Sequence, residues 1–155
     1  MSEIINIGGL SAAPGQRVHG FISIGNGEFS LPATIIRGET PGKTALITAG
    51  IHAGEYVGIQ SAVELGRDLK IEKMTGTVII VKVVGREEFE NRYGSLCREN
   101  QENLNRVFPG KKDGTKYEKL AYAVVEELQK AADYYIDLHS GDDYEKLTPY
   151  VYYAG

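Results

Sequence analysis

The 155-residue chain contains one cysteine, no tryptophan and no long apolar run. The single Cys97 excludes a disulfide within the chain and fits a reducing compartment. No apolar stretch reaches the roughly 20 residues that a membrane-spanning helix needs. The N-terminus also lacks the basic and apolar regions of a signal peptide. We therefore expect a cytoplasmic protein that does not interact with membranes.

Positive charge does not predominate in this chain. The chain has 17 lysines and arginines against 21 aspartates and glutamates, which gives a net charge of −4 at pH 7. Because no basic stripe is present, we expect no nucleic-acid partner. The hydrophobic share of 42% and the charged share of 25% are ordinary for a globular protein. The length predicts one domain over residues 1–155, which is long enough to bury a core.

The first forty residues carry the signals of an antiparallel hairpin. Residues 17–24 alternate apolar and polar side chains, which is typical of a half-exposed strand. The sequence Gly25-Asn26-Gly27 predicts a turn, and residues 31–37 are the expected partner strand. We expect residues 1–40 to form an N-terminal β-hairpin region that packs on the rest of the domain.

The rest of the chain alternates expected strands and helices. Short or continuous apolar runs predict strands at residues 44–50, 76–84, 134–139 and 149–154. Helical spacing of apolar residues predicts helices over residues 55–69 and from Thr115, where Thr115 and Glu118 have the form of a capping box. This order predicts an α/β fold, with a mostly parallel mixed sheet flanked by helices. Ligands in such sheets bind beyond the carboxyl ends of the strands.

Two of the three histidines lie at these strand ends. His52 follows the strand at residues 44–50, Glu55 comes three residues later, and His139 closes the strand at residues 134–139. Taken singly, either histidine could have a purely structural role, and Glu55 could merely begin a helix. Their joint placement favours the set of three protein ligands of a catalytic zinc site, with a fourth position for water.

A long polar loop over residues 85–114 holds further candidates. Loops of this length in a compact domain are usually functional or disordered. The apolar residues Leu104 and Phe108 indicate an ordered segment. Arginine presents a planar fork of donors that fits a carboxylate, so Arg98 and Arg106 suit an anionic substrate. Each arginine could equally be a solvated loop charge.

Three motifs together resemble one known family. They are GIHAGE at residues 50–55, NLNRVFPG at residues 103–110 and DLH at residues 137–139. Their order is that of the succinylglutamate desuccinylase/aspartoacylase family, which is related to the zinc carboxypeptidases. The resemblance runs from about Thr44 to the C-terminus. It implies a zinc carboxypeptidase-like (phosphorylase/hydrolase-like) fold.

The resemblance also implies an activity. It implies a zinc-dependent amidohydrolase that cleaves the amide bond of a small N-acyl amino acid, with one zinc ion bound by His52, Glu55 and His139. The family's general-base glutamate lies some tens of residues beyond the second ligand histidine. We therefore expect this chain to be the N-terminal part of a longer enzyme, which binds zinc but turns over poorly. The alternatives are a zinc carboxypeptidase that acts on peptides and a non-catalytic module that binds zinc or a ligand.

The remaining candidate residues take their roles from the same resemblance. Arg98 matches the arginine that polarises the scissile carbonyl group. Asn105 and Arg106 match the pair that binds the substrate carboxylate. Asn103 occupies the position of a residue that orients a zinc-bound histidine. Asp137 is expected either to orient a ligand in the same way or to cap a backbone group at the strand end.

Overall fold

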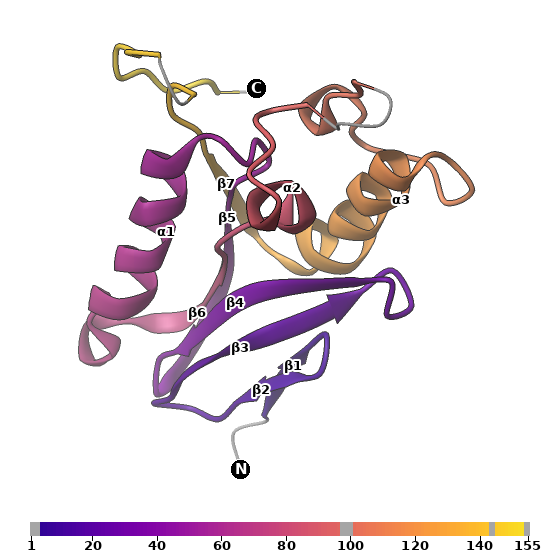
Figure 1. Ribbon diagram of the computed structural model, residues 1–155. Coiled ribbons are helices and arrows are strands. Elements are labelled where there is room, and N and C mark those ends of the chain that lie inside the picture. The colour runs from indigo at the N-terminus through magenta and orange to yellow at the C-terminus, as the bar shows by residue number, and fades with distance from the viewer. Residues whose placement is uncertain (1–3, 97–100, 143–144, 154–155) are drawn as a thin grey trace.

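The computed structural model describes residues 4–96, 101–142 and 145–153. Within these residues one five-stranded sheet has helices on both faces (Figure 1). The strands, in their order across the sheet, are β3 (Arg17–Ile24), β4 (Phe29–Arg37), β6 (Thr75–Val81), β5 (Thr40–Ala49) and β7 (Tyr134–Leu138). A small separate sheet pairs β1 (Ile5–Ile7) with β2 (Leu10–Ala12). The predicted mixed sheet flanked by helices is confirmed.

The sheet has an antiparallel part and a parallel part. β3 and β4 form the expected hairpin, and β4 is also antiparallel to β6. The hairpin turn contains Asn26 with a φ of 54°, a left-handed conformation that asparagine tolerates. β5 lies between β6 and β7 and is parallel to both. The parallel part is therefore confined to three strands, and their carboxyl ends meet at one edge of the sheet.

The helices follow the predicted order. The described helical segments are α1 (Tyr56–Asp68), η1 (Ile71–Lys73), α2 (Arg86–Glu90), η2 (Leu104–Arg106), α3 (Lys116–Ala123), η3 (Val124–Leu128) and η4 (Gln129–Ala131). The capping box at the start of α3 is confirmed. Thr115 Oγ1 accepts from the Glu118 backbone N–H at 3.2 Å, and the Glu118 carboxylate accepts from the Thr115 N–H at 2.9 Å. The long loop is thus interrupted by two short helical turns, α2 and η2.

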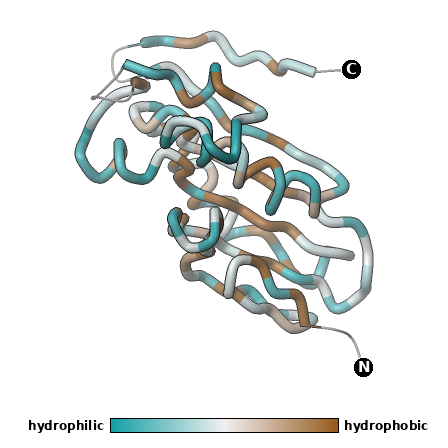
Figure 2. Tube along the Cα trace, turned by 90° about the vertical axis from the view of Figure 1, so that its right-hand side faces the viewer, coloured by the Kyte–Doolittle hydropathy of each residue, from teal (hydrophilic) through white to brown (hydrophobic). Residues whose placement is uncertain are grey.

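The sheet separates two apolar clusters, because alternate strand residues point to opposite faces. On the α1 face the buried members are Ile36, Ile47, Ala49, Ala62 and Ile80. The cluster on the α3 face is larger and includes Leu46, Ile79, Val81, Leu120 and Val124. Along the Cα trace, hydrophobic residues gather in the middle of the molecule (Figure 2). With both faces covered, the carboxyl-terminal halves of β5 and β6 are mostly apolar and buried.

One predicted strand is wrong. Residues 149–153 are not a strand, and Val151 and Tyr153 are 93% and 90% exposed. The segment pairs with none of the described strands, and an extended chain becomes a strand only when a neighbour satisfies its backbone groups. No described helix is long and apolar enough to cross a membrane.

Candidate metal centre

A sharp turn after β5 carries His52 and Glu55. Gly50, at its start, has a φ of +63°, which glycine adopts without a steric penalty. A side chain at this position would also come within 3.1 Å of the Val83 Cα atom. Glu55 is the residue just before α1, and only 7% of it is exposed. The turn thereby buries a carboxylate at the amino end of a helix, where the helix dipole favours negative charge.

His139 reaches the same place from β7. Because β5 and β7 are parallel neighbours, His52 and His139 follow strand ends that lie side by side. α1 also packs closely on the end of β7, since a Cβ atom on Gly58 would lie 3.0 Å from the Leu138 carbonyl oxygen. This close approach sets Glu55 beside His139.

The Glu55 carboxylate lies between the two imidazole rings. Its Oε1 is 2.6 Å from His52 Nδ1, and its Oε2 is 2.9 Å from His139 Nδ1. The backbone N–H of Ser140 donates to the same Oε2 at 2.8 Å. One possible ligand atom from each of the three residues lies within 4.8 Å of the others. The three side chains predicted as metal ligands therefore converge.

The outer nitrogen of each ring is bonded to a further oxygen. Asn103 Oδ1 lies 3.0 Å from His52 Nε2, and Asp137 Oδ2 lies 2.7 Å from His139 Nε2. Since these oxygens accept, each Nε2 carries a proton and each Nδ1 is directed at Glu55. Metal-binding histidines commonly donate their second N–H to an oxygen in this way. Asn103, expected to orient a zinc-bound histidine, and Asp137, expected either to do so or to cap a backbone group, are thus both in contact with an imidazole ring.

The cluster holds a negative charge between two basic groups. Burial raises the pKa of Glu55, but hydrogen bonds from His139, His52 and the Ser140 N–H outweigh it and lower the pKa to about 2. The hydrogen bonds to Asp137 and Glu55 raise the pKa of His139 to about 10. The bond to Glu55 likewise raises the pKa of His52. Protons and a cation would therefore compete for the same ligand atoms of this cluster.

The predicted substrate residues lie in or near η2. Asn103 caps this turn, because its Oδ1 also accepts from the Asn105 N–H at 2.9 Å. Asn105 lines a hollow of about 410 Å³ together with Asp137. Arg106 is exposed and donates to the Asn105 carbonyl oxygen at 3.2 Å. Arg98 lies outside the described residues.

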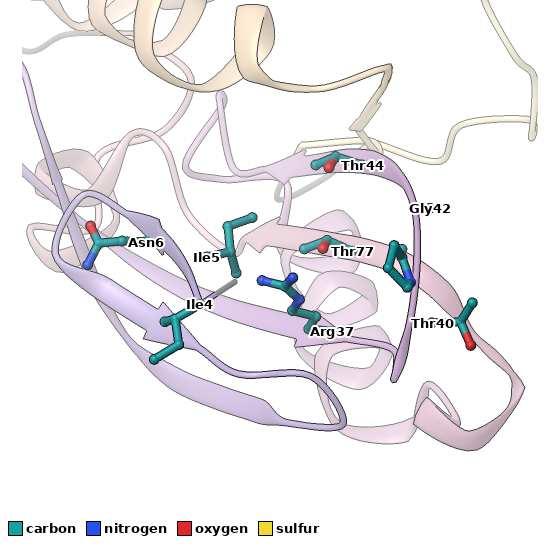
Figure 3. A pocket seen from close by; sticks show the side chains of 10 residues that line it. Ile4, Ile5, Asn6, Arg37, Thr40, Gly42, Thr44 and Thr77 are labelled. Atoms are coloured by element: carbon teal, nitrogen blue, oxygen red, sulfur yellow. The ribbon is translucent and has the colours of Figure 1, made fainter. Parts of the chain in front are cut away.

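A second hollow lies at the opposite edge of the sheet, at the amino ends of β5 and β6. It measures about 370 Å³, and the Arg37 side chain points into it between Ile5 and Thr77 (Figure 3). Ligands of open α/β sheets bind at the carboxyl ends of the strands, where the histidines lie. The cluster of His52, Glu55 and His139 is therefore the candidate site.

Three contacts of the cluster were not expected from the sequence. They are the Ser140 N–H on Glu55, and the side chains of Thr48 and Tyr135 behind Asp137. Once β5 and β7 are known to be neighbours, their register predicts one of these contacts, because Thr48 lies directly opposite Asp137.

The chain is similar to known proteins. The chain is 36% identical over 140 residues to an N-alpha-acetyl-L-2,4-diaminobutyric acid deacetylase of Halomonas elongata. The match covers 85% of this chain and 40% of that protein. The chain thus spans about 40% of the length of this relative.

Solved structures of similar proteins also match the fold of this chain. The product-bound ectoine utilization protein EutE (DoeB) of Ruegeria pomeroyi matches with a TM-score of 0.68 at 35% identity, over 81% of this chain and 40% of that chain. A succinylglutamate desuccinylase from Silicibacter sp. TM1040 matches with a TM-score of 0.68 at 34% identity, with the same coverage of 81% and 40%. A metallo-carboxypeptidase from Burkholderia cenocepacia, at 17% identity and a TM-score of 0.56 over 81% of this chain and 37% of that chain, shares the fold. Residues 41–154 match the Succinylglutamate desuccinylase/Aspartoacylase catalytic domain, and the chain belongs to this family.

Proposed function

We propose that this chain carries the metal-binding part of a zinc-dependent amidohydrolase, which removes the acyl group from a small N-acyl amino acid. The observation that carries the proposal is the convergence of two imidazole nitrogens and one carboxylate at the sheet edge. Two nitrogen ligands and one oxygen ligand suit catalytic zinc, which keeps a further position open. The Halomonas elongata relative, a deacetylase by name, supports an amide of an amino acid as the substrate.

Each residue has a proposed part. His52, Glu55 and His139 would hold the zinc ion, which when bound supplies a Lewis acid that polarises a carbonyl group. Asn103 and Asp137 keep the histidine rings turned with Nδ1 toward Glu55.

The substrate would lie beside the cluster. The hollow of about 410 Å³ has apolar walls and the polar groups of Asn105 and Asp137, which suits a small ligand with a few polar atoms. We propose that Asn105 and Arg106 bind the substrate carboxylate and that Arg98 polarises the scissile carbonyl group. The roles of these three residues rest on the family resemblance.

Hydrolysis of an amide also needs a group that transfers a proton. Among the described residues, the carboxylates in contact with the histidines are Glu55 and Asp137. Glu55 is a proposed ligand, and Asp137 already accepts two hydrogen bonds. A positioned general base typically contributes about 10²- to 10⁴-fold in rate. We therefore propose that the 155-residue chain by itself binds zinc and turns over slowly.

The alternative function, a carboxypeptidase that acts on peptides, has weaker support than a deacylase. The likeness to the metallo-carboxypeptidase is at 17% identity, which shows the fold alone. The relatives at 34–36% identity carry the names of a deacetylase and a desuccinylase. A small N-acyl amino acid is for this reason the preferred substrate.

Zinc binding tests the proposal directly. The purified chain is stripped with a chelator, loaded with zinc and compared with two variants, His52→Ala and His19→Ala. We expect one zinc ion per chain in the parent and in His19→Ala, because His19 bonds to Thr34 away from the cluster. His52→Ala should lose the ion. Equal zinc contents in all three proteins would refute the site. Rapid hydrolysis of an N-acetyl diamino acid by the chain, abolished by His52→Ala, would refute slow turnover.

A further inference from the structure

The hydrogen bonds that hold Asp137 continue into the sheet. Thr48 Oγ1 lies 2.6 Å from Asp137 Oδ1, and the hydroxyl oxygen of Tyr135 lies 2.9 Å from the same Thr48 oxygen. Thr48 is on β5, directly opposite Asp137 on β7, and is fully buried. Tyr135 comes two residues before Asp137, so both side chains point to the same face of the sheet. A continuous path of side chains thus leads from the α3 face of the sheet to His139.

The chemistry of these groups fixes the direction of each bond. An ionised carboxylate only accepts, so the one hydroxyl proton of Thr48 goes to Asp137. Thr48 Oγ1 must then accept from the Tyr135 hydroxyl. A phenol keeps its proton near neutral pH, and partial burial together with the nearby Asp137 raises the pKa of Tyr135 further, to about 12. Tyr135 therefore donates to Thr48, and Thr48 donates to Asp137.

Thr48 is a polar residue in the buried part of β5. Its chain neighbours on β5, Ile47 and Ala49, are buried and apolar. A buried hydroxyl without a partner would cost about 1–3 kcal/mol, so a threonine is favourable here only because its oxygen is used. Its partner is not a backbone group but the carboxylate that contacts His139.

We propose that Thr48 and Tyr135 are positioning residues for the metal ligand His139. Thr48 occupies Asp137 Oδ1 and thereby leaves Oδ2 for His139 Nε2. The carboxylate is held at both oxygens, so the imidazole ring is held with Nδ1 toward Glu55. This inference rests on the proposed function, because it takes His139 to be a ligand.

A valine at position 48 tests it. Thr48→Val keeps the shape of the side chain and removes the hydroxyl, and Thr48→Ser keeps the hydroxyl. Thr34→Val is the matched control, because Thr34 is also fully buried in the sheet but bonds to His19. Zinc affinity is measured by competition with a chromogenic chelator. We expect Thr48→Val to weaken zinc binding about tenfold, at the low end of the range for residues that support a ligand. Thr48→Ser and Thr34→Val should bind as the parent does.

A second measurement needs no metal. In the metal-free chain the Nε2 proton of His139 is observed by ¹⁵N-resolved NMR. We expect it to exchange slowly with water in the parent and in Thr34→Val, and much faster in Thr48→Val. Tyr135→Phe removes the outer donor but leaves the bond between Thr48 and Asp137, so it should shift both readouts in the same direction by less. It provides the test if Thr48→Val does not fold.

The outcomes separate the two proposals. If Thr48→Val, or Tyr135→Phe in its place, has the zinc affinity and the proton exchange of the parent, the positioning role is refuted. If the parent binds no zinc while the His139 proton still responds to Thr48→Val, the positioning of His139 stands and the proposed function fails.

Discussion

Replacing Glu55 with glutamine removes the charge at the centre of the cluster and keeps its size. The carboxylate accepts from two imidazoles and one backbone N–H, and only 10% of its side chain is exposed. A glutamine has one carbonyl oxygen, so its amide group would face the Nδ1–H of His52 or His139 as a second donor. The variant therefore loses a charge-assisted bond, and the imidazole that faces the amide group must give up its Nδ1 proton in order to accept from it.

The pKa of Glu55 gives the size of the effect. A fall from the ordinary value of 4.5 to about 2 means that the folded, metal-free chain prefers the ionised form. At about 1.4 kcal/mol per pKa unit, the preference is roughly 3 kcal/mol. Because the pKa is lower in the folded chain, this stabilisation is complete above about pH 4.5 and is lost as the pH falls toward 2. We expect Glu55→Gln to lower the free energy of unfolding by roughly 2–3 kcal/mol at pH 7, and by progressively less below pH 4.5.

Urea denaturation in the presence of a chelator measures this difference at a series of pH values. Glu64→Gln is the control, because Glu64 lies on the exposed side of the same helix, and its effect should stay within about 0.5 kcal/mol. The chelator matters because bound zinc would add a stabilisation that only the parent has. A loss below about 1 kcal/mol at pH 7, or a loss that does not change with pH, would contradict the electrostatic account of the cluster.

Two further substitutions test how the fold supports the site. Gly58→Val places a side chain within 3.0 Å of the Leu138 carbonyl oxygen, so we expect it to push α1 away from β7 and cost about 2 kcal/mol. Zinc affinity should fall with it, and unchanged affinity in a folded variant would show that this contact does not set the distance between Glu55 and His139. Thr115→Ala removes the hydroxyl of the α3 capping box and should cost about 1 kcal/mol in urea denaturation, with unchanged zinc affinity. No loss of stability would mean that neighbouring contacts already hold the start of α3.

The sequence predicts those features that depend on local patterns. The apolar runs of β5 and β7 and the residues that end them are contiguous in the chain. His52, Glu55 and His139 could therefore be placed at one edge before any pairing was known. The capping box at Thr115 is local in the same sense.

Features that depend on register could not be predicted in this way. The Thr48–Asp137 bond joins two strands about ninety positions apart, and it requires that β7 pair with β5 with this particular alignment. Residues 149–153 fail for a related reason, since their pattern is that of a strand but a strand also needs a partner. Arg98 matches the family motif and lies outside the described residues, so its role in polarising the scissile carbonyl group stays a prediction.

The proposed ligands are held in place by bonds that do not involve a cation. Glu55 is held by the backbone N–H of Ser140 and by the turn into α1, and each imidazole is held by an oxygen on its far side. The two histidines thus need no large reorientation, because protons on Nδ1 already hold the rings toward the carboxylate. The cost of assembling the ligands falls on folding rather than on binding, which is how a rigid sheet edge raises affinity. The same logic explains why a buried threonine one strand away can matter, since an ion bound by three residues responds to each bond that fixes their directions.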